Sequence, residues 1–352
     1  MEILQTITAL SHEFGSDDYV KGGGGNTSCK NADTLWVKPS GTTLAGLQPE
    51  NFVALDRAKI DELYAIATPE DKHARETLVK DVMSQALMPG SSGRASVEAP
   101  LHNVFATTYV VHTHPALVNG MTCAKEGKAA CERLFPEALW MDYIDAGYTL
   151  CMTAREVLKQ FEKSHGREPD VIFLKNHGVF VAGNSPEDIR ARYAQIMDTL
   201  RAEYAKAGVT LDLSVAEKGD TAKTESALRE LLGDDAASIH ASGRFDVADG
   251  PITPDHIVYS KSYPFTAALT AENIAAFKTR HGYVPRVIVT ADAVFGVGAS
   301  EKVAELALVM ADDGALVKQL AEAFGGIEYM TDPAREFIEN WEVEAYRAKQ
   351  MT

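Results

Sequence analysis

The stretch YVVHTHP, residues 109–115, is the most informative part of this sequence. Its apolar, β-branched start predicts a strand. Because side chains alternate along a strand, His112 and His114 should project from the same face. Two imidazoles placed in this way can grip one divalent metal ion. The alternative is a pair of partly exposed sheet histidines with no ligand role.

A third histidine lies in KNHG, residues 175–178. The Asn176-His177-Gly178 sequence indicates a tight turn between two apolar stretches, 171–174 and 179–181, that read as strands. His177 could complete a set of three neutral imidazoles. Such a set leaves positions open on Zn²⁺, which is typical of a catalytic site and not of a structural one. Taken alone, His177 is a weak signal.

Glu98 and His102 are four residues apart in a segment that reads as helical, so they share one face. A carboxylate near a metal, but not bound to it, suits a general base that takes a proton from the substrate. Glu98 could equally be a solvated residue at a helix N-terminus, where the helix dipole favours it. We expect His102 to pack behind the site.

Glycine-rich residues 22–25 precede Asn26-Thr27-Ser28 and have the composition of an anion-binding nest. A strand and not a helix should follow them, which argues against a P-loop and against a dinucleotide-binding fingerprint. A second turn of small residues, Ser40-Gly41, follows Lys38-Pro39. Either turn taken alone could be an ordinary loop.

Periodicity outside these motifs predicts the chain's organisation. Ser185 and Pro186 should begin a helix that runs to about residue 206 and ends at Gly208. The polar, acid-rich residues 209–226 suggest a boundary, so we expect domains at 1–210 and 211–352. In the second domain, strand-like HIVYSK (256–261) and RVIVTADAVFGVG (286–298) alternate with helical patterns. The expected elements are helices at 2–13, 69–88, 271–282 and 301–325 and a strand at 34–38.

Composition excludes several classes of protein. The 352 residues carry 34 Lys and Arg against 50 Asp and Glu, a net charge of −16, which disfavours nucleic acid and anionic lipid as partners. No apolar run approaches the roughly 18 residues of a membrane helix. The N-terminal residues do not resemble a signal peptide. The four cysteines form no C-x-x-C pair, so we expect free, buried thiols and a cytoplasmic protein.

Five motifs occur in one order: GGGGNTS (22–28), KPSGTTL (38–44), S-x-E-x-x-x-H (96–102), HTHP (112–115) and KNHG (175–178). Together they resemble the class II aldolase/adducin family over roughly residues 1–208. With its extension ending in ENWEVEAYR (339–347), the chain is most similar to the aldolase portion of bifunctional rhamnulose-phosphate aldolase/short-chain dehydrogenase proteins. The resemblance implies a mixed, mainly antiparallel sheet flanked by helices, with a smaller C-terminal α/β domain.

The resemblance also implies site residues. Zn²⁺ or another divalent metal would sit on His112, His114 and His177, and Glu98 would be the catalytic acid/base. Phosphate would be held by five residues, of which Ser96 belongs to a serine pair in many members of the family. This chain has Val97 at the second position of that pair, which removes one hydroxyl donor. The phosphate-binding positions are Gly25, Asn26, Ser40, Gly41 and Ser96.

The implied activity is a zinc-dependent lyase that reversibly cleaves a ketose phosphate through a metal-stabilised enediolate. The same site would serve two alternatives, 4-epimerisation of a ribulose phosphate and decarboxylation of a 3-oxo acid phosphate. A non-enzymatic, adducin-like scaffold is disfavoured, because those members lack the metal histidines. We expect a homotetramer. The chain leaves no room for the dehydrogenase part, so we expect no nicotinamide cofactor. The sequence assigns no role to the C-terminal domain.

Overall fold

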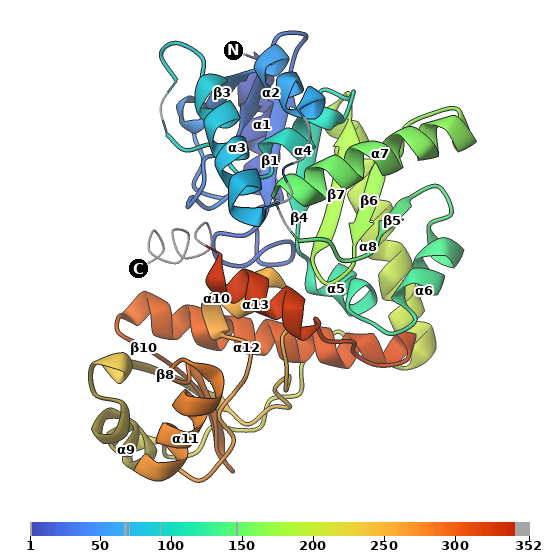
Figure 1. Cartoon of the computed structure of the whole chain (residues 1–352). Helices are drawn as coiled ribbons and strands as arrows, with labels where there is room; N and C mark the ends of the chain where they lie inside the picture. Colours follow the sequence, from blue (N-terminus) through green and yellow to red (C-terminus); the bar gives the residue numbers. More distant parts are fainter. Residues whose placement is uncertain (1, 67–68, 70, 92, 146, 342–352) are drawn as a thin grey trace. The chain divides into compact units, whose positions relative to one another are not determined.

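The computed structural model describes residues 2–66, 69, 71–91, 93–145 and 147–341. The chain forms two compact units (Figure 1). The first comprises Met1–Val118 and Lys128–Thr199, and the second comprises Asn119–Gly127 and Leu200–Thr352. Each unit has a sheet and a hydrophobic core of its own.

The first unit is built on a seven-stranded sheet of order β3-β2-β1-β4-β7-β6-β5. All neighbouring strands are antiparallel except β5 and β6, which are parallel. The prediction of a mixed, mainly antiparallel sheet is therefore confirmed. The strands are β1 (Asn26–Lys30), β2 (Thr34–Val37), β3 (Val53–Asp56), β4 (Tyr109–Thr113), β5 (Leu139–Met141), β6 (Val171–Leu174) and β7 (Gly178–Gly183).

Helices cover both faces of this sheet. On one face, Ser11 of α1 bonds Thr27 of β1 at 2.7 Å, and Tyr193 of α8 donates to the Val111 carbonyl at 3.2 Å. On the other face lie α4 and α7 (Figure 1), whose apolar residues form one cluster with Val110 and Phe180. The helices that lie wholly or partly in this unit are α1 (Glu2–Glu13), α2 (Arg57–Glu62), α3 (Lys72–Gln85), α4 (Ala99–Val104), α5 (Ala116–Thr122), α6 (Gly127–Leu134), α7 (Tyr148–His165) and α8 (Pro186–Ala207), with short 3₁₀ turns at Pro49–Asn51 and Leu63–Ala65.

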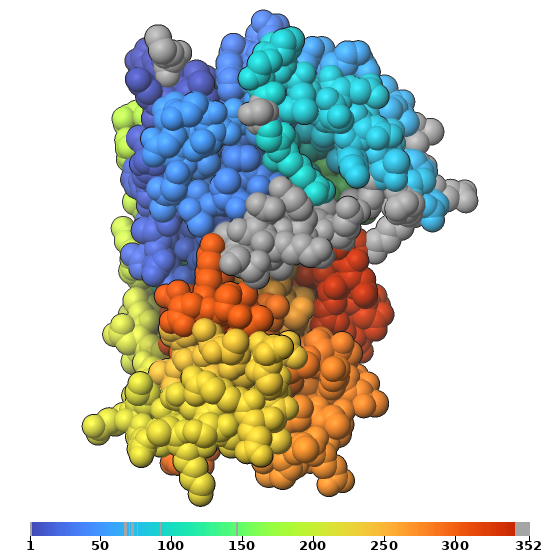
Figure 2. All heavy atoms as spheres, turned by 90° about the vertical axis from the view of Figure 1, so that its left-hand side faces the viewer, coloured from blue at the N-terminus to red at the C-terminus, as the bar shows by residue number. Residues whose placement is uncertain are grey.

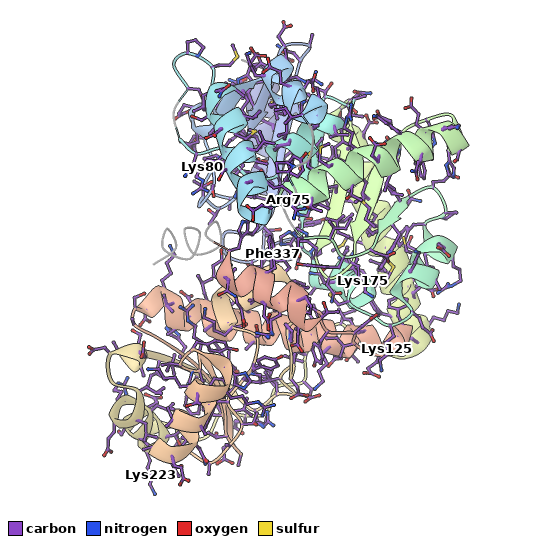
Figure 3. All side chains as sticks on the ribbon, in the orientation of Figure 1. Arg75, Lys80, Lys125, Lys175, Lys223 and Phe337 are labelled. Atoms are coloured by element: carbon purple, nitrogen blue, oxygen red, sulfur yellow. The ribbon has the colours of Figure 1, made fainter. Side chains whose placement is uncertain are left out.

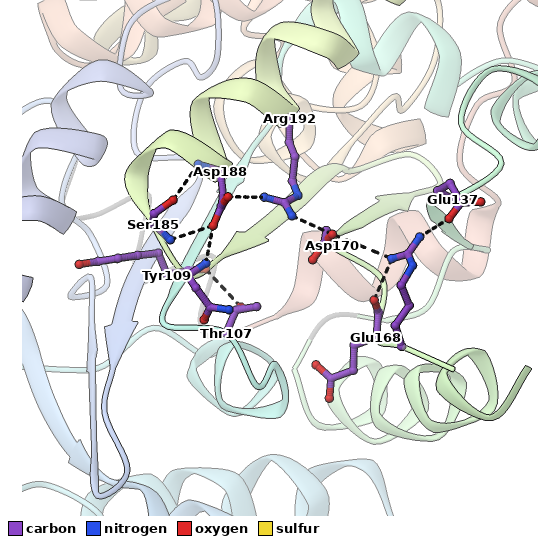
Figure 4. A network of polar contacts seen from close by, with 10 residues as sticks. Thr107, Tyr109, Glu137, Glu168, Asp170, Ser185, Asp188 and Arg192 are labelled. Carbon is purple, nitrogen blue, oxygen red and sulfur yellow. Dashed lines mark hydrogen bonds and ion pairs between the residues drawn. The ribbon is translucent and has the colours of Figure 1, made fainter. Parts of the chain in front are cut away.

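The start of α8 shows why its boundary is readable from sequence. The Ser185 hydroxyl accepts from the Asp188 N–H at 3.1 Å, and the Asp188 carboxylate accepts from the Ser185 N–H at 3.0 Å, so two helix-end donors are satisfied reciprocally. Arg192 then bridges Asp188 to Asp170, which stands just before β6 (Figure 4). The predicted helix at 186–206 is confirmed.

The second unit has a three-stranded antiparallel sheet of order β8-β10-β9. Its core includes Leu228, Phe265, Ile288 and Phe295. Figure 2 shows its yellow and orange segments gathered into one body. Its remaining elements are α9 (Ala222–Leu232), β8 (Ser238–Gly243), α10 (Pro254–Ser260), α11 (Ala271–His281), β9 (Val287–Val289), β10 (Ala293–Gly298), α12 (Glu301–Ala321) and α13 (Asp332–Asn340), with 3₁₀ turns at Gly233–Ala236 and Glu322–Phe324.

The strand predicted at 256–261 is wrong. Residues 256–260 belong to helix α10, because Thr253 caps it by accepting from the His256 N–H and Pro254 occupies the first turn. Every residue of this helix is buried. The sequence therefore shows no polar face that repeats at the spacing of a helix. A short buried helix and a buried strand cannot be told apart by periodicity.

The remaining sequence predictions concern which side chains are buried and whether any helix could span a membrane. All four cysteines are buried and free, as predicted. Charged side chains such as Lys80 on α3 and Lys223 on α9 point outward (Figure 3). Among the described residues, no helix combines the length and the apolar character needed to cross a bilayer.

Candidate active site

Three histidines converge at one end of β4 and β7. His112 lies in β4 opposite Phe180 of β7, His114 follows β4 directly, and His177 stands in the turn between β6 and β7. One nitrogen from each imidazole lies within 4.8 Å of the other two. The Nε2 atoms of His112 and His114 are 2.9 Å apart. Three nitrogens at this spacing could hold one divalent ion.

The backbone around His177 accounts for its position. Asn176 adopts a left-handed conformation with φ of 52°, which asparagine tolerates better than most residues, and the His177 N–H donates to the Leu174 carbonyl at 3.2 Å. Gly178 then passes close to β4. A Cβ at this position would lie 2.4 Å from the Thr113 carbonyl oxygen and 2.7 Å from the His114 ring. Glycine is therefore required for the turn to bring His177 beside His114.

His112 is held from two sides. Its Nδ1–H donates to the Val179 carbonyl oxygen at 3.0 Å. Its ring stacks on Phe180, with the ring centroids 3.9 Å apart and the planes inclined by 7°. Because a neutral imidazole carries one proton, donation from Nδ1 leaves the Nε2 lone pair directed at the other histidines. This tautomer is the one a metal ligand needs.

Glu98 stands immediately before α4 and faces this cluster. Its Oε1 lies 3.4 Å from His112 Nε2 and 4.0 Å from His177 Nε2. Asn26 Nδ2 donates to the other oxygen, Oε2, at 3.3 Å, and also to the Ser96 hydroxyl. Burial raises the pKa of Glu98, but its electrostatic and hydrogen-bond interactions with the adjacent imidazoles, those of His112 first, outweigh burial and hold that pKa well below its usual range. The carboxylate is thus ionised.

His102 is not one of the converging histidines. Its Nδ1 shares a hydrogen bond of 2.8 Å with the Ser28 hydroxyl, and its ring meets Phe180 edge-on. Burial, together with the nearby positive groups, lowers the pKa of His102 to about 3, so its ring is neutral. Lys30 donates to the His102 carbonyl at 2.9 Å. These contacts fix the short helix α4 that follows Glu98.

The segments expected to hold phosphate come together beside Glu98. Asn26 pairs with His112 across β1 and β4, and Gly25 precedes it with φ of 68°. The Ser40 N–H donates to the Arg94 carbonyl at 2.8 Å, and Pro39 forms a bridge with Ala95. Residues 94–96 therefore lie against the turn after β2 that contains Ser40 and Gly41. The structure brings four chain segments together here.

Three supporting residues have no role in the sequence predictions: Ser28, Lys30 and Phe180. Ser28 and Lys30 share a face of β1 with Asn26, and Phe180 faces His112 from β7. The contact of Asn26 with Glu98 is also not predicted by the motifs. Four of the five residues of β1 are polar or charged although the whole strand is buried, and this polarity next to the glycine run is the sequence signal that could have revealed Ser28 and Lys30.

The chain is similar to a number of known proteins, including the following three. The Uncharacterized oxidoreductase YuxG of Bacillus subtilis (strain 168) is 29% identical over 195 residues, which is 52% of this chain and 27% of that protein. The chain thus spans about a quarter of this relative's length. L-fuculose phosphate aldolase of Methanocaldococcus jannaschii is 26% identical over 165 residues, which is 47% of this chain and 75% of that protein. The solved N-terminal class II aldolase domain of a conserved protein from Thermoplasma acidophilum is 22% identical with a TM-score of 0.49, covering 56% of this chain and 92% of that one.

A family match covers more than half of the chain. The Class II Aldolase and Adducin N-terminal domain matches residues 5–204, which contain all five sequence motifs and all four converging side chains. The chain therefore belongs to the class II aldolase and adducin family.

Proposed function

We propose that this protein is a metal-dependent lyase that reversibly cleaves a ketose phosphate. The observation that supports the proposal is the arrangement of one carboxylate beside three convergent imidazoles: Glu98 Oε1 lies 3.4 Å from His112 Nε2, and one nitrogen of each histidine lies within 4.8 Å of the others. An aldol cleavage needs these two parts, an electrophilic centre that stabilises an oxyanion and a base that moves a proton beside it.

The metal would be held by His112, His114 and His177. These residues fit the group, because the bond from His112 Nδ1 to Val179 leaves Nε2 free to coordinate, and because Glu98 supplies negative charge nearby. When bound, Zn²⁺ or another divalent ion would supply Lewis acidity for the negative charge of an enediolate. Three protein ligands leave room for substrate oxygens.

Glu98 would move the proton at the donor carbon. Asn26 holds one carboxylate oxygen and thereby orients the other toward the substrate. Asn26 Oδ1 is buried and has no hydrogen-bond partner among the described residues. A buried acceptor left unpaired is costly, so a substrate hydroxyl that donates to it would be favoured. Asn26 would then position the base and the substrate together.

The phosphate would lie against Gly25, Asn26, Ser40, Gly41 and Ser96. The Ser40 N–H already donates to Arg94. The donors contributed by this turn would therefore be its hydroxyl and the N–H of Gly41. Val97 contributes no hydroxyl, so the proposed phosphate site has one hydrogen-bond donor fewer than a site with a serine pair. We expect weaker dependence on phosphate than such a site would show.

Two further reactions suit the same residues, 4-epimerisation of a ribulose phosphate and decarboxylation of a 3-oxo acid phosphate. Both need an oxyanion stabilised beside a proton-transfer group. Their products differ: the lyase gives two fragments, the epimerase gives one isomer, and the decarboxylase gives CO₂. An adducin-like scaffold would give no product and bind no metal.

The test combines metal analysis with product analysis. Purified protein is assayed by mass spectrometry for metal and is incubated with a panel of ketose phosphates, whose products are separated by chromatography. We expect about one divalent ion per chain and two fragments from at least one substrate. His112→Ala should lose both the ion and the activity, whereas His240→Ala, at an ion pair with Glu301 in the second unit, should lose neither. Stoichiometric metal in a His112→Ala/His114→Ala double variant would contradict the assignment.

We further propose that the chain assembles as a homotetramer. The net charge of −16 favours solubility and does not prevent a symmetric oligomer.

A further inference from the structure

A second candidate site lies entirely within the second unit, in a cleft of about 440 Å³. Helix α11 forms one wall and the extended residues 263–267 form the other. The volume falls in the range of about 300–1,000 Å³ that is typical of small-molecule sites. The residues that matter for recognition are Tyr263, Phe265, Asn273, Phe277, Arg280 and His281.

Helix α11 directs one face into this cleft. Asn273, Phe277 and Arg280 follow one another at spacings of four and three, so their side chains line a single stripe. Asn273 Nδ2 donates to the Ala268 carbonyl at 2.8 Å, which ties the start of the helix to the segment that leads into it from residues 263–267.

Aromatic rings dominate the lining. The ring of His281 lies 4.6 Å from that of Tyr263 and 4.5 Å from that of Phe277, measured between centroids. Phe265 packs behind Phe277 at 5.7 Å. Tyr263, Phe277 and His281 are only partly buried, so some of their surface faces the cleft. A flat ring could bury that surface by stacking on these rings.

The lining carries one cation, Arg280, and one carboxylate, Asp249. Arg280 is exposed and forms no ion pair with any described residue. Asp249 lies 3.5 Å from Lys318, which also pairs with Asp246 at 3.0 Å, so this carboxylate is engaged by a cation outside the lining. Burial lowers the pKa of His281, and the positive charges of Arg280 and Arg335 lower it further. Its neutral ring can therefore accept or donate a hydrogen bond.

We propose that this cleft binds a small organic anion that carries a flat ring. The ring would lie against Tyr263 and Phe277, and the phosphate or carboxylate would meet the Arg280 guanidinium in a charge-assisted bond. The net charge of the chain repels anions. An arginine that has no ion pair and lies beside partly exposed aromatic rings is the kind of local arrangement that can still bind an anion. All the lining residues of the cleft belong to the second unit, whereas the three converging histidines belong to the first.

Calorimetric titration of the full chain tests this proposal. The two ring-bearing anions are adenosine monophosphate and 4-hydroxybenzoate, one for each source of negative charge. Adenosine tests the ring alone, and inorganic phosphate tests the anion alone. We expect at least one ring-bearing anion to bind with a dissociation constant between micromolar and millimolar, and each separate part to bind at least tenfold more weakly.

Three variants locate the binding. Arg280→Ala should weaken it tenfold or more. Lys278→Ala removes another exposed cation from the same helix turn but not from the cleft lining, and it should change the affinity less than twofold. Ala276→Glu places a carboxylate in the lining at an exposed position and should abolish binding. The proposal is overturned if neither ring-bearing anion gives saturable binding at millimolar concentration, if phosphate alone binds equally well, or if Arg280→Ala and Lys278→Ala behave alike.

Discussion

The burial of Lys30 leads us to expect an unusual pH dependence of the free energy of unfolding. This lysine is 3% exposed in the middle of the first unit, and its ammonium donates to the His102 carbonyl at 2.9 Å. Burial, helped by the positive charge of Arg57, lowers the pKa of Lys30 from 10.5 to about 7. A folded chain at neutral pH therefore holds this proton much less tightly than an unfolded chain does.

The direction of the effect follows from proton counting. Between pH 7 and pH 10.5 the unfolded lysine keeps a proton that the folded lysine has largely released. Since the unfolded state binds more protons, the contribution of Lys30 to the free energy of unfolding rises with pH in this window. Below pH 7 the lysine is charged in both states, and the full penalty of burying the charge remains. Each pH unit within the window is worth about 1.4 kcal/mol. Because the folded lysine is half protonated near pH 7, the gain from pH 7 to pH 9 is about 2 kcal/mol.

The assay compares Lys30→Met with the unmodified protein at pH 7, 8 and 9. Urea unfolding is followed by tryptophan fluorescence, for which Trp36 is well placed, since it pairs with Cys29 across β1 and β2. Methionine removes the charge and the hydrogen bond at every pH, so its constant cost cancels when the difference is plotted against pH. We expect the stability of the unmodified protein relative to the variant to increase by about 2 kcal/mol between pH 7 and pH 9.

Lys80→Met, which removes an exposed lysine from α3, is the control and should keep the pH dependence of the unmodified protein. A difference between Lys30→Met and the unmodified protein that stays flat from pH 7 to pH 9 would refute the reasoning. A difference that falls with pH would show that Lys30 gains its proton on folding.

Three further outcomes are expected. Glu98→Gln should retain the metal, because in the proposed site the three imidazoles are the ligands, and it should lower kcat by roughly 10² to 10⁴. Metal analysis and steady-state kinetics measure the two effects, and loss of the metal would instead make Glu98 a ligand. Gly178→Ala should lower both metal affinity and thermal stability, because its Cβ would lie 2.7 Å from the His114 ring, whereas Gly219→Ala, with no atom within 4 Å, should leave both unchanged. Light scattering at micromolar concentration should give the mass of four chains, and a monomeric mass would count against the tetramer.

The sequence predicts elements best where local chemistry decides them. Helix α8 is predicted within one residue because Ser185 and Asp188 satisfy its first donors from within the helix end itself. Strand β4 is predicted because its β-branched residues precede His112 without a break. Helix α10 is mistaken for a strand because its environment, and not its pattern, decides its conformation: the entire helix is buried. A buried segment without a polar face loses the signal on which such prediction depends.

The candidate site shows a similar division. Because side chains alternate along a strand, the two-residue spacing alone predicts that His112 and His114 share a face. The approach of His177 depends on the pairing of β4 with β7, which is set by contacts far apart in sequence. The turn signal of Asn176-His177-Gly178 makes His177 a candidate third ligand, but a weak one, and the order of the motifs strengthens the prediction through the family resemblance. The contact of Asn26 with Glu98 was missed for the same reason, since β1 must first pair with β4.

The sheet explains why these distant residues must act together. Asn26, His112 and Phe180 lie side by side on three neighbouring strands, because Asn26 pairs with His112 and His112 pairs with Phe180. A shift of one residue in either pairing would turn that strand's side chains to the opposite face. The first shift would take the Asn26 amide away from Glu98, and the second would remove the ring that stacks on His112. The buried apolar residues that fix the register of β1, β4 and β7 therefore also fix the geometry of Glu98 and of the histidines.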